Sequence, residues 1–176
     1  MKSITLLVCG IVLMGHAAFA GEPAKKEMGV AQIHGTAEGS SIAGTATFED
    51  VKGGLKVTVN ITGLTGDKHA LHIHEFGDCG DAGKAAGSHY NPDNAPHGDA
   101  MKDAKHAHPG DMGNVTVKDG AIILEAVLPQ AALTHGKHKV AGRSIVLHEK
   151  ADDFSQPVGN AGARIACGVI SIVAGK

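Results

Sequence analysis

The chain has 176 residues, the length of one domain, and its 43% hydrophobic content excludes a disordered or fibrous protein. Its composition is unusual for a globular domain, because only 3% of the residues are aromatic while 25 are glycine and 12 are histidine. The formal net charge of -2 excludes the strongly basic surface typical of nucleic-acid-binding proteins. An aliphatic chain rich in glycine and histidine favours strands, loops and bound metal.

The first 20 residues have the pattern of a secretory signal peptide. Lys2 provides a positive n-region, residues 4–14 are apolar, and Ala18 and Ala20 provide a small-x-small cleavage site. An apolar stretch of about 11 residues falls short of the ~20 that span a bilayer, which disfavours a membrane anchor. Lipid attachment at Cys9 is disfavoured because the small cleavage-site residues lie downstream of it. We expect a signal peptide at 1–20, a short polar leader at 21–28 and one domain at 29–176.

The expected domain consists of about eight strands separated by turns. Apolar, β-branched or alternating runs occur at residues 30–36, 42–48, 55–61, 71–76, 115–117, 121–128, 144–147 and 165–173. Gly53-Gly54 and Asp119-Gly120 lie between pairs of these runs and favour hairpin turns. No long segment has a helical repeat. The pattern therefore predicts an all-β fold, an antiparallel barrel or sandwich, rather than alternating strands and helices.

Two long segments interrupt this rhythm, at residues 77–112 and 150–163. Loops of such length are usually functional or disordered. The first contains four histidines and six aspartates among glycine and proline, unlike the Ser-, Lys- and Glu-rich composition of a flexible linker. We therefore expect this loop to carry ligands and to be held by metal.

Two histidines, His72 and His74, lie in the expected strand at residues 71–76. Alternate residues of a strand share a face, so both imidazoles project to one side while Leu71 and Ile73 project into the core. His148 follows the run at 144–147 and is a third candidate. An exposed strand face without metal is the alternative interpretation. Three imidazoles on two strands fit copper, which can keep one position open for a small ligand.

The long loop supplies a second candidate group: His89, His97, His108 and Asp111. Three imidazoles and one carboxylate form a closed tetrahedral set of the type that holds structural zinc. The alternative is a loop whose scattered histidines bind nothing.

Two cysteines, Cys79 and Cys167, remain after removal of the signal peptide. An even number of cysteines in an exported chain favours one disulfide. Two buried thiols are the alternative.

Six segments together resemble the copper/zinc superoxide dismutases. They are LHIHEFGD at 71–78, GSHYNP at 87–92, HG at 97–98, HPGDMGN at 108–114, VLHEKADD at 146–153 and GNAGARIACGVI at 159–170. The resemblance covers essentially all of residues 29–174. It implies an eight-stranded Greek-key barrel, described in the family as a sandwich, with two long functional loops.

The resemblance also implies roles for single residues. His89 would bridge two metals, copper held with His72, His74 and His148, and zinc held with His97, His108 and Asp111. Asp152 resembles the carboxylate that hydrogen-bonds one copper histidine and one zinc histidine and fixes their tautomers. Arg164 resembles the cation beside copper that attracts the anionic substrate, and it would be catalytic together with His89. His69 resembles a structural histidine that binds no metal.

The implied reaction is the disproportionation of superoxide. One superoxide reduces Cu(II) and leaves as oxygen, and the next oxidises Cu(I) and takes up two protons to give hydrogen peroxide, while the bridging imidazole of His89 exchanges a proton. The implied substrate is the superoxide anion. The chain would act as a monomer or a homodimer, and neither a nucleic-acid partner nor a membrane span is implied. The alternative is an exported copper or zinc carrier without activity. The complete ligand sets and the presence of Arg164 argue against it.

Two features resemble the bacterial exported branch of the family rather than the eukaryotic one. Cys79 follows His74 by only five residues, and the segment at 150–163 is short and lacks a run of charged Glu and Lys residues. Together with the signal peptide they imply a periplasmic enzyme that protects this compartment from superoxide. Lys84 is a candidate for guiding superoxide in place of the missing charged run.

The remaining histidines of the expected domain are interpreted as loop or surface residues. They are His34, His106, His135 and His138. His135 and His138 are close enough in sequence to be a candidate for a weak additional metal site.

Overall fold

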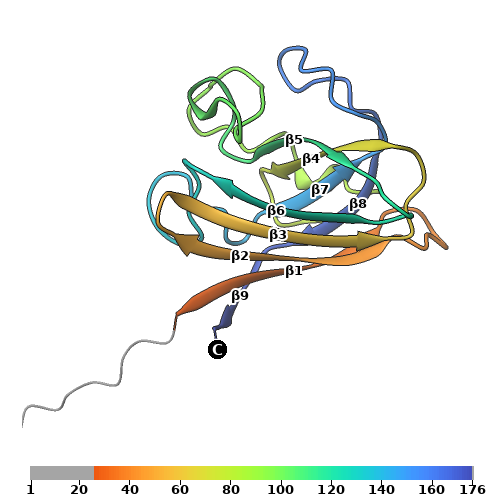
Figure 1. The fold of residues 1–176 in the computed structure, drawn as a ribbon, viewed down its shortest axis with the longest axis horizontal. Coiled ribbons are helices and arrows are strands. Elements are labelled where there is room, and N and C mark those ends of the chain that lie inside the picture. Colours follow the sequence, from red (N-terminus) through yellow and green to blue (C-terminus); the bar gives the residue numbers. More distant parts are fainter. Residues whose placement is uncertain (1–25, 176) are drawn as a thin grey trace, which may run out of the picture.

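The computed structural model describes residues 26–175, which form a nearly closed β-barrel (Figure 1). The expected signal peptide at 1–20 and residues 21–25 of the leader lie outside the described residues. Two short 3-10 helices, η1 at Lys84–Ala86 and η2 at Ala104–His106, lie in the long loop. The strands of the described range are β1 Glu27–Gly35, β2 Ala43–Val51, β3 Gly54–Thr62, β4 Lys68–His74, β5 Asp111–Thr116, β6 Ile122–Leu128, β7 Ser144–His148, β8 Arg164–Val169 and β9 Ser171–Ala174.

The strands pair in the order β5-β4-β7-β8-β1-β2-β3-β6, and every pair is antiparallel. The two end strands, β5 and β6, contact each other without pairing, so the barrel closes by packing rather than by a ladder. The chain leaves β3 for β4 on the opposite side, and β6 then returns beside β3, a Greek-key type of crossover. The all-β, antiparallel prediction is confirmed. Within residues 26–175 we find no helix long and apolar enough to cross a membrane.

The core is aliphatic because the strands alternate between the barrel interior and solvent. In β3 the inward residues Leu55, Val57, Val59 and Ile61 are all fully buried, whereas the residues between them are half-buried or exposed. Each such side chain contributes about 1.5–3 kcal/mol to folding when its apolar surface leaves water. Phe48 on β2 is the largest fully buried side chain of the described residues, and the large buried side chains that follow it are isoleucine, leucine and methionine.

The boundaries of several expected strands differ from the structure. β5 begins at Asp111 rather than at residue 115, so the expected loop at 77–112 ends two residues earlier. The run at 165–173 divides into β8 and β9, because the Ile170 backbone N–H donates to Arg143 (2.8 Å) and its carbonyl accepts from Gly142 (2.8 Å) instead of continuing the ladder. β1 begins at Glu27, two residues before the expected start of the domain, since Glu27 and Met28 pair with β9. β4 ends at His74, so the expected strand residue Phe76 lies beyond it and is 53% exposed.

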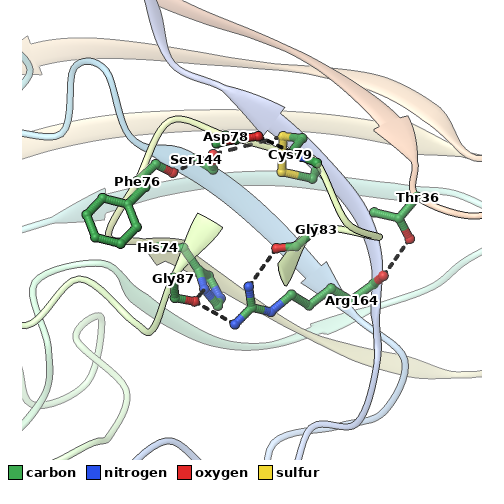
Figure 2. The surroundings of a disulfide bond; sticks show 11 residues. Thr36, His74, Phe76, Asp78, Cys79, Gly83, Gly87, Ser144 and Arg164 are labelled. Atoms are coloured by element: carbon green, nitrogen blue, oxygen red, sulfur yellow. Dashed lines mark hydrogen bonds between the residues drawn. A yellow bond between two sulfur atoms is a disulfide. The ribbon is translucent and has the colours of Figure 1, made fainter. Parts of the chain in front are cut away.

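The long loop covers the outer face of β4, β7 and β8, and a disulfide fastens it there. Cys79 at the start of the loop is bonded to Cys167 on β8, with a Cα–Cα distance of 5.7 Å (Figure 2). Ala86 and Val146 pack with these cysteines in a small cluster, which is separate from the barrel core. The expected disulfide is confirmed, and the alternative of two buried thiols is wrong.

We expect the Cys79→Ser variant to be less stable than the wild type by up to about 4–5 kcal/mol, because the disulfide closes a long loop in the unfolded chain. The sequence separation of 88 residues between the cysteines is the basis of this value. Guanidinium denaturation followed by circular dichroism measures the difference. Reductant should destabilise the wild type but not the variant, and equal midpoints for the two oxidised proteins would contradict the prediction.

Candidate metal centre

The alternation of β4 places its two histidines outside the barrel core. Leu71 and Ile73 pair with Leu147 and Ile145 of β7 and belong to the core, whereas His72 and His74 point to the opposite side, under the long loop. All of these side chains are buried, because the loop covers the histidine face as well. The predicted common face of His72 and His74 is therefore also buried.

Four histidines meet on this face. His72, His74, His89 and His148 each offer one ring nitrogen, and these nitrogens lie within 4.8 Å of one another. His148 ends β7, and His89 lies beside His74 in an isolated antiparallel bridge. The Nε2 atoms of His74 and His148 face each other at 3.2 Å. We call this set the four-histidine group.

A second group surrounds the carboxylate of Asp111, the first residue of β5. The Nδ1 atoms of His89, His97 and His108 lie 3.0, 2.7 and 3.1 Å from its oxygens. All four side chains are buried. This set, which we call the Asp111 group, has three nitrogen donors and one oxygen donor and shares His89 with the four-histidine group.

The donor atoms of both groups fit metal ions. The Nδ1 atoms of His72, His108 and His148 are buried, and within the described part of the chain they have no hydrogen-bond partner. Buried polar atoms are nearly always satisfied, so such nitrogens indicate a ligand. Imidazoles suit copper, and a nitrogen-rich set with one carboxylate suits tetrahedral zinc.

Asp152 links the two groups, as expected from the resemblance. Its Oδ2 atom accepts hydrogen bonds from Nε2 of His72 (2.9 Å) and Nε2 of His97 (2.7 Å). The backbone of Asp152 is held by Asn114, which accepts from its N–H (2.6 Å) and donates to its carbonyl (2.9 Å). Both ring nitrogens that bond Asp152 carry their hydrogens, so a metal would bind these two rings through their Nδ1 atoms.

Burial keeps three of the site histidines neutral. It lowers the pKa of His74 to about 2, that of His148 to about 3 and that of His89 to about 4, so these rings retain a free lone pair at neutral pH. Burial also lowers the pKa of His97, but the hydrogen bonds and negative charges of Asp111 and Asp152 have the larger effect and raise it to about 9. Against the effect of its own burial, Asp111 has a pKa far below the usual range because His108, His89 and His97 hydrogen-bond it.

Arg164 on β8 is held beside the four-histidine group by two carbonyls of the loop. Its Nη1 donates to Gly83 (2.6 Å) and its Nη2 to Gly87 (2.5 Å), and the same Gly87 carbonyl accepts from Nδ1 of His74 (3.0 Å) (Figure 2). The Gly83 N–H bonds the carbonyl of Cys79, so the disulfide and Arg164 fix the same stretch of loop. Lys84 follows Gly83 and is exposed.

His69 is buried but has no nitrogen left for metal. Its Nδ1 lies 2.8 Å from the carbonyl of His148, and its Nε2 lies 2.8 Å from the carbonyl of Thr65. These contacts support the expectation that His69 is a structural residue, which here anchors the end of β7.

The other four histidines of residues 26–175 are exposed or half-buried and lie outside both groups. His135 contacts Asp50 (3.3 Å), while His138 contacts Asp93 (2.6 Å) and the carbonyl of Gln130 (3.1 Å). Because His135 and His138 bond different carboxylates, the described residues do not bring them together in a metal-binding group.

Three further residues at the site carry no metal-binding signal in the sequence. Asn114 holds Asp152, Phe154 packs its ring on His97 with centroids 6.2 Å apart, and Gln156 bonds the backbone of His97. Their only sequence signal is position, since Asn114 ends one of the six motif segments and the other two follow Asp152 closely.

We expect zinc binding to the Asp111 group at pH 7 to release about one proton, because His97 is protonated without metal and must lose the Nδ1 proton to become a ligand. His74 and His148 are already neutral and release no proton when they bind copper. Calorimetric titrations in buffers of different ionisation enthalpy count these protons. Zinc binding whose heat does not depend on the buffer would contradict the prediction.

Comparison with known proteins agrees with this geometry. The family model described as copper/zinc superoxide dismutase (SODC) matches residues 42–170. The chain is 38% identical over 141 residues to an extracellular superoxide dismutase [Cu-Zn] of Caenorhabditis elegans, covering 76% of this chain and 63% of that protein. It is 42% identical over 137 residues to superoxide dismutase [Cu-Zn] A of Xenopus laevis, covering 73% and 89% of the two chains.

A solved structure is similar as well. The crystal structure of the clock protein EA4 superposes with a TM-score of 0.74 at 36% identity, covering 91% of this chain and all (100%) of that one. Together with the two groups of ligands that share His89, these similarities identify the chain as a member of the copper/zinc superoxide dismutase family.

Proposed function

We propose that the chain is a superoxide dismutase, which converts two superoxide ions and two protons into one molecule each of oxygen and hydrogen peroxide. The observation that carries this proposal is the pairing of the two groups through His89 and Asp152, with Arg164 beside the first. A metal carrier needs ligands, but it needs neither a link between two sites nor a cation held next to one of them. The carrier remains the alternative that the experiment below tests.

The ligand sets follow from the donor atoms. His72, His74, His89 and His148 would hold copper, and His89, His97, His108 and Asp111 would hold zinc. When bound, copper supplies one-electron exchange between Cu(II) and Cu(I), and zinc supplies a fixed positive charge that orders the loop.

His89 is the residue of the site best placed to hold and pass a proton. Its Nδ1 faces Asp111 at 3.0 Å, which leaves Nε2 on the side of the four-histidine group. We assign to His89 Nε2 the uptake and return of one proton in each cycle.

Arg164 attracts and orients the substrate. A guanidinium stays charged in proteins even where burial lowers its pKa, as it does here. A fixed cation near the copper ligands raises the local concentration of a small anion and speeds its arrival. The exposed Lys84, next to the Gly83 carbonyl that holds Arg164, adds positive charge to the same approach.

We expect His148→Ala to reduce superoxide consumption by more than roughly a hundredfold, since even outer partners of a metal ligand are typically worth ~10–100-fold. The assay uses the mature chain loaded with copper and zinc. His135→Ala is the matched control, because this exposed histidine lies outside both groups and should leave the rate unchanged. A wild-type chain that binds both metals but consumes no superoxide would be a carrier.

We also propose export, with residues 1–20 as a cleaved signal peptide, 21–28 as a leader and 29–176 as the dismutase domain. The signal pattern and the short segment at 150–163 support a place in the bacterial exported branch and in the periplasm. That one relative is named as an extracellular enzyme is compatible with export. The chain would act as a monomer or a homodimer.

In a bacterial host we expect the periplasmic protein to begin at Gly21, because signal peptidase cuts after a small-x-small pattern. Intact mass spectrometry of the periplasmic fraction measures the start. Ala20→Leu should block the cut and leave the precursor in the membrane fraction. Recovery of the full-length chain from the cytosol would contradict export.

A further inference from the structure

The segment that carries His97 is held by side chains rather than by backbone pairing. Within the described part of the chain, residues 95–98 form no backbone–backbone hydrogen bond. Instead, the Asn91 amide donates to the Ala95 carbonyl and accepts from its N–H, both at 2.9 Å. Asp111 accepts from the N–H of Gly98 (3.2 Å). The position of His97 between these points therefore depends on a third side chain.

That side chain is Gln156. Its Oε1 accepts from the backbone N–H of His97 (2.8 Å), and its Nε2 donates to the carbonyl of the same residue (2.9 Å). One amide thus satisfies both polar groups of one residue, in the way that a neighbouring strand would. Methionine, of similar length, could occupy the same space but could form neither bond.

Gln156 belongs to the loop that also holds the ring of His97. Asp152 accepts from its Nε2 (2.7 Å), Phe154 stacks against the ring, and Gln156 fixes the backbone. Three alternate residues of one loop therefore contact one histidine. The loop itself is ordered by the carboxylate of Asp153, which accepts from the backbone N–H groups of Ser155 and Asn160, both at 3.0 Å.

We propose that Gln156 is a positioning residue of the zinc site. It fixes the backbone of His97 before metal arrives, so that Nδ1 of the ring already lies against Asp111, and zinc is retained longer because the ligand cannot swing away. The inference rests on the proposed function, since it requires the Asp111 group to hold zinc. Preorganised ligands bind more tightly because less conformational freedom is lost on binding.

The test compares zinc release from Gln156→Met and the wild type, each as the full mature chain loaded with zinc alone and mixed with a chromogenic chelator. We expect the variant to release zinc roughly tenfold faster, the lower end of the ~10–100-fold effect of residues that orient metal ligands. Gln156→Glu keeps the acceptor for the His97 N–H, but it loses the donor and adds a negative charge opposite the His97 carbonyl, so its rate should lie between the two. Cobalt in place of zinc should show an altered visible spectrum in Gln156→Met.

Two controls distinguish the pair of hydrogen bonds from Gln156 to the His97 backbone, which we call the Gln156 clamp, from a general loosening of the loop. Gln32→Met makes the same chemical change on the exposed face of β1, and Asn160→Ala loosens the loop without touching His97. Both should release zinc like the wild type, and all the metal-free variants should keep the wild-type circular dichroism spectrum and a cooperative unfolding transition. A wild-type release rate and cobalt spectrum in Gln156→Met, or equally fast release from Asn160→Ala, would overturn the proposal.

The same measurements distinguish this inference from the proposed function. If the wild type binds no zinc at the Asp111 group, both fall. If zinc is bound and released as expected but the copper- and zinc-loaded chain consumes no superoxide, the proposed role of Gln156 is supported and the dismutase proposal is wrong.

Discussion

Burying six imidazoles and two carboxylates between a barrel wall and a loop is unfavourable unless each polar atom finds a partner. The two carboxylates meet much of this need, Asp111 for the Nδ1 atoms of His89 and His97 and Asp152 for two Nε2 atoms. The Gly87 carbonyl serves His74. Within the described residues the Nδ1 atoms without a partner belong to His72, His108 and His148, which are all proposed ligands, so metal binding would satisfy them.

The barrel contributes rigidity, and the loops contribute chemistry. β4 and β7 present histidines from strands whose other faces are locked in the core, so these side chains have little freedom. The loop can lie close to β4 because Gly110 has no side chain. A Cβ atom at this position would lie only 2.5 Å from the Cβ atom of Ile73. The Ile73 N–H donates to the Gly110 carbonyl at this point. Close approach is thus the condition for bringing Asp111 to the histidines.

The local sequence pattern was sufficient to predict which segments form strands and which histidines lie on them. The period of two identified the runs that became β1 to β8 and placed His72 and His74 on one face. It could not locate the division between β8 and β9, because that depends on backbone bonds from the turn at Gly142 and Arg143. The loop composition also indicated the zinc ligands, whereas the bridging role of His89 and the role of Asp152 needed the resemblance. Gln156 was not predictable by either route, because it acts through an amide whose partner lies 59 residues away.

The disulfide determines what a single proteolytic cut does to the molecule, because it closes a covalent ring between Cys79 and Cys167. His72 and His74 precede Cys79, while the other proposed ligands, Asp152, Gln156 and Arg164 all lie inside the covalent ring that Cys79 and Cys167 close. A protease that cuts one exposed peptide bond within this ring opens the ring without separating two fragments. The nicked protein would keep its mass, apart from one added water, until a reductant reached the disulfide, so an intact band on a non-reducing gel says little about an intact loop.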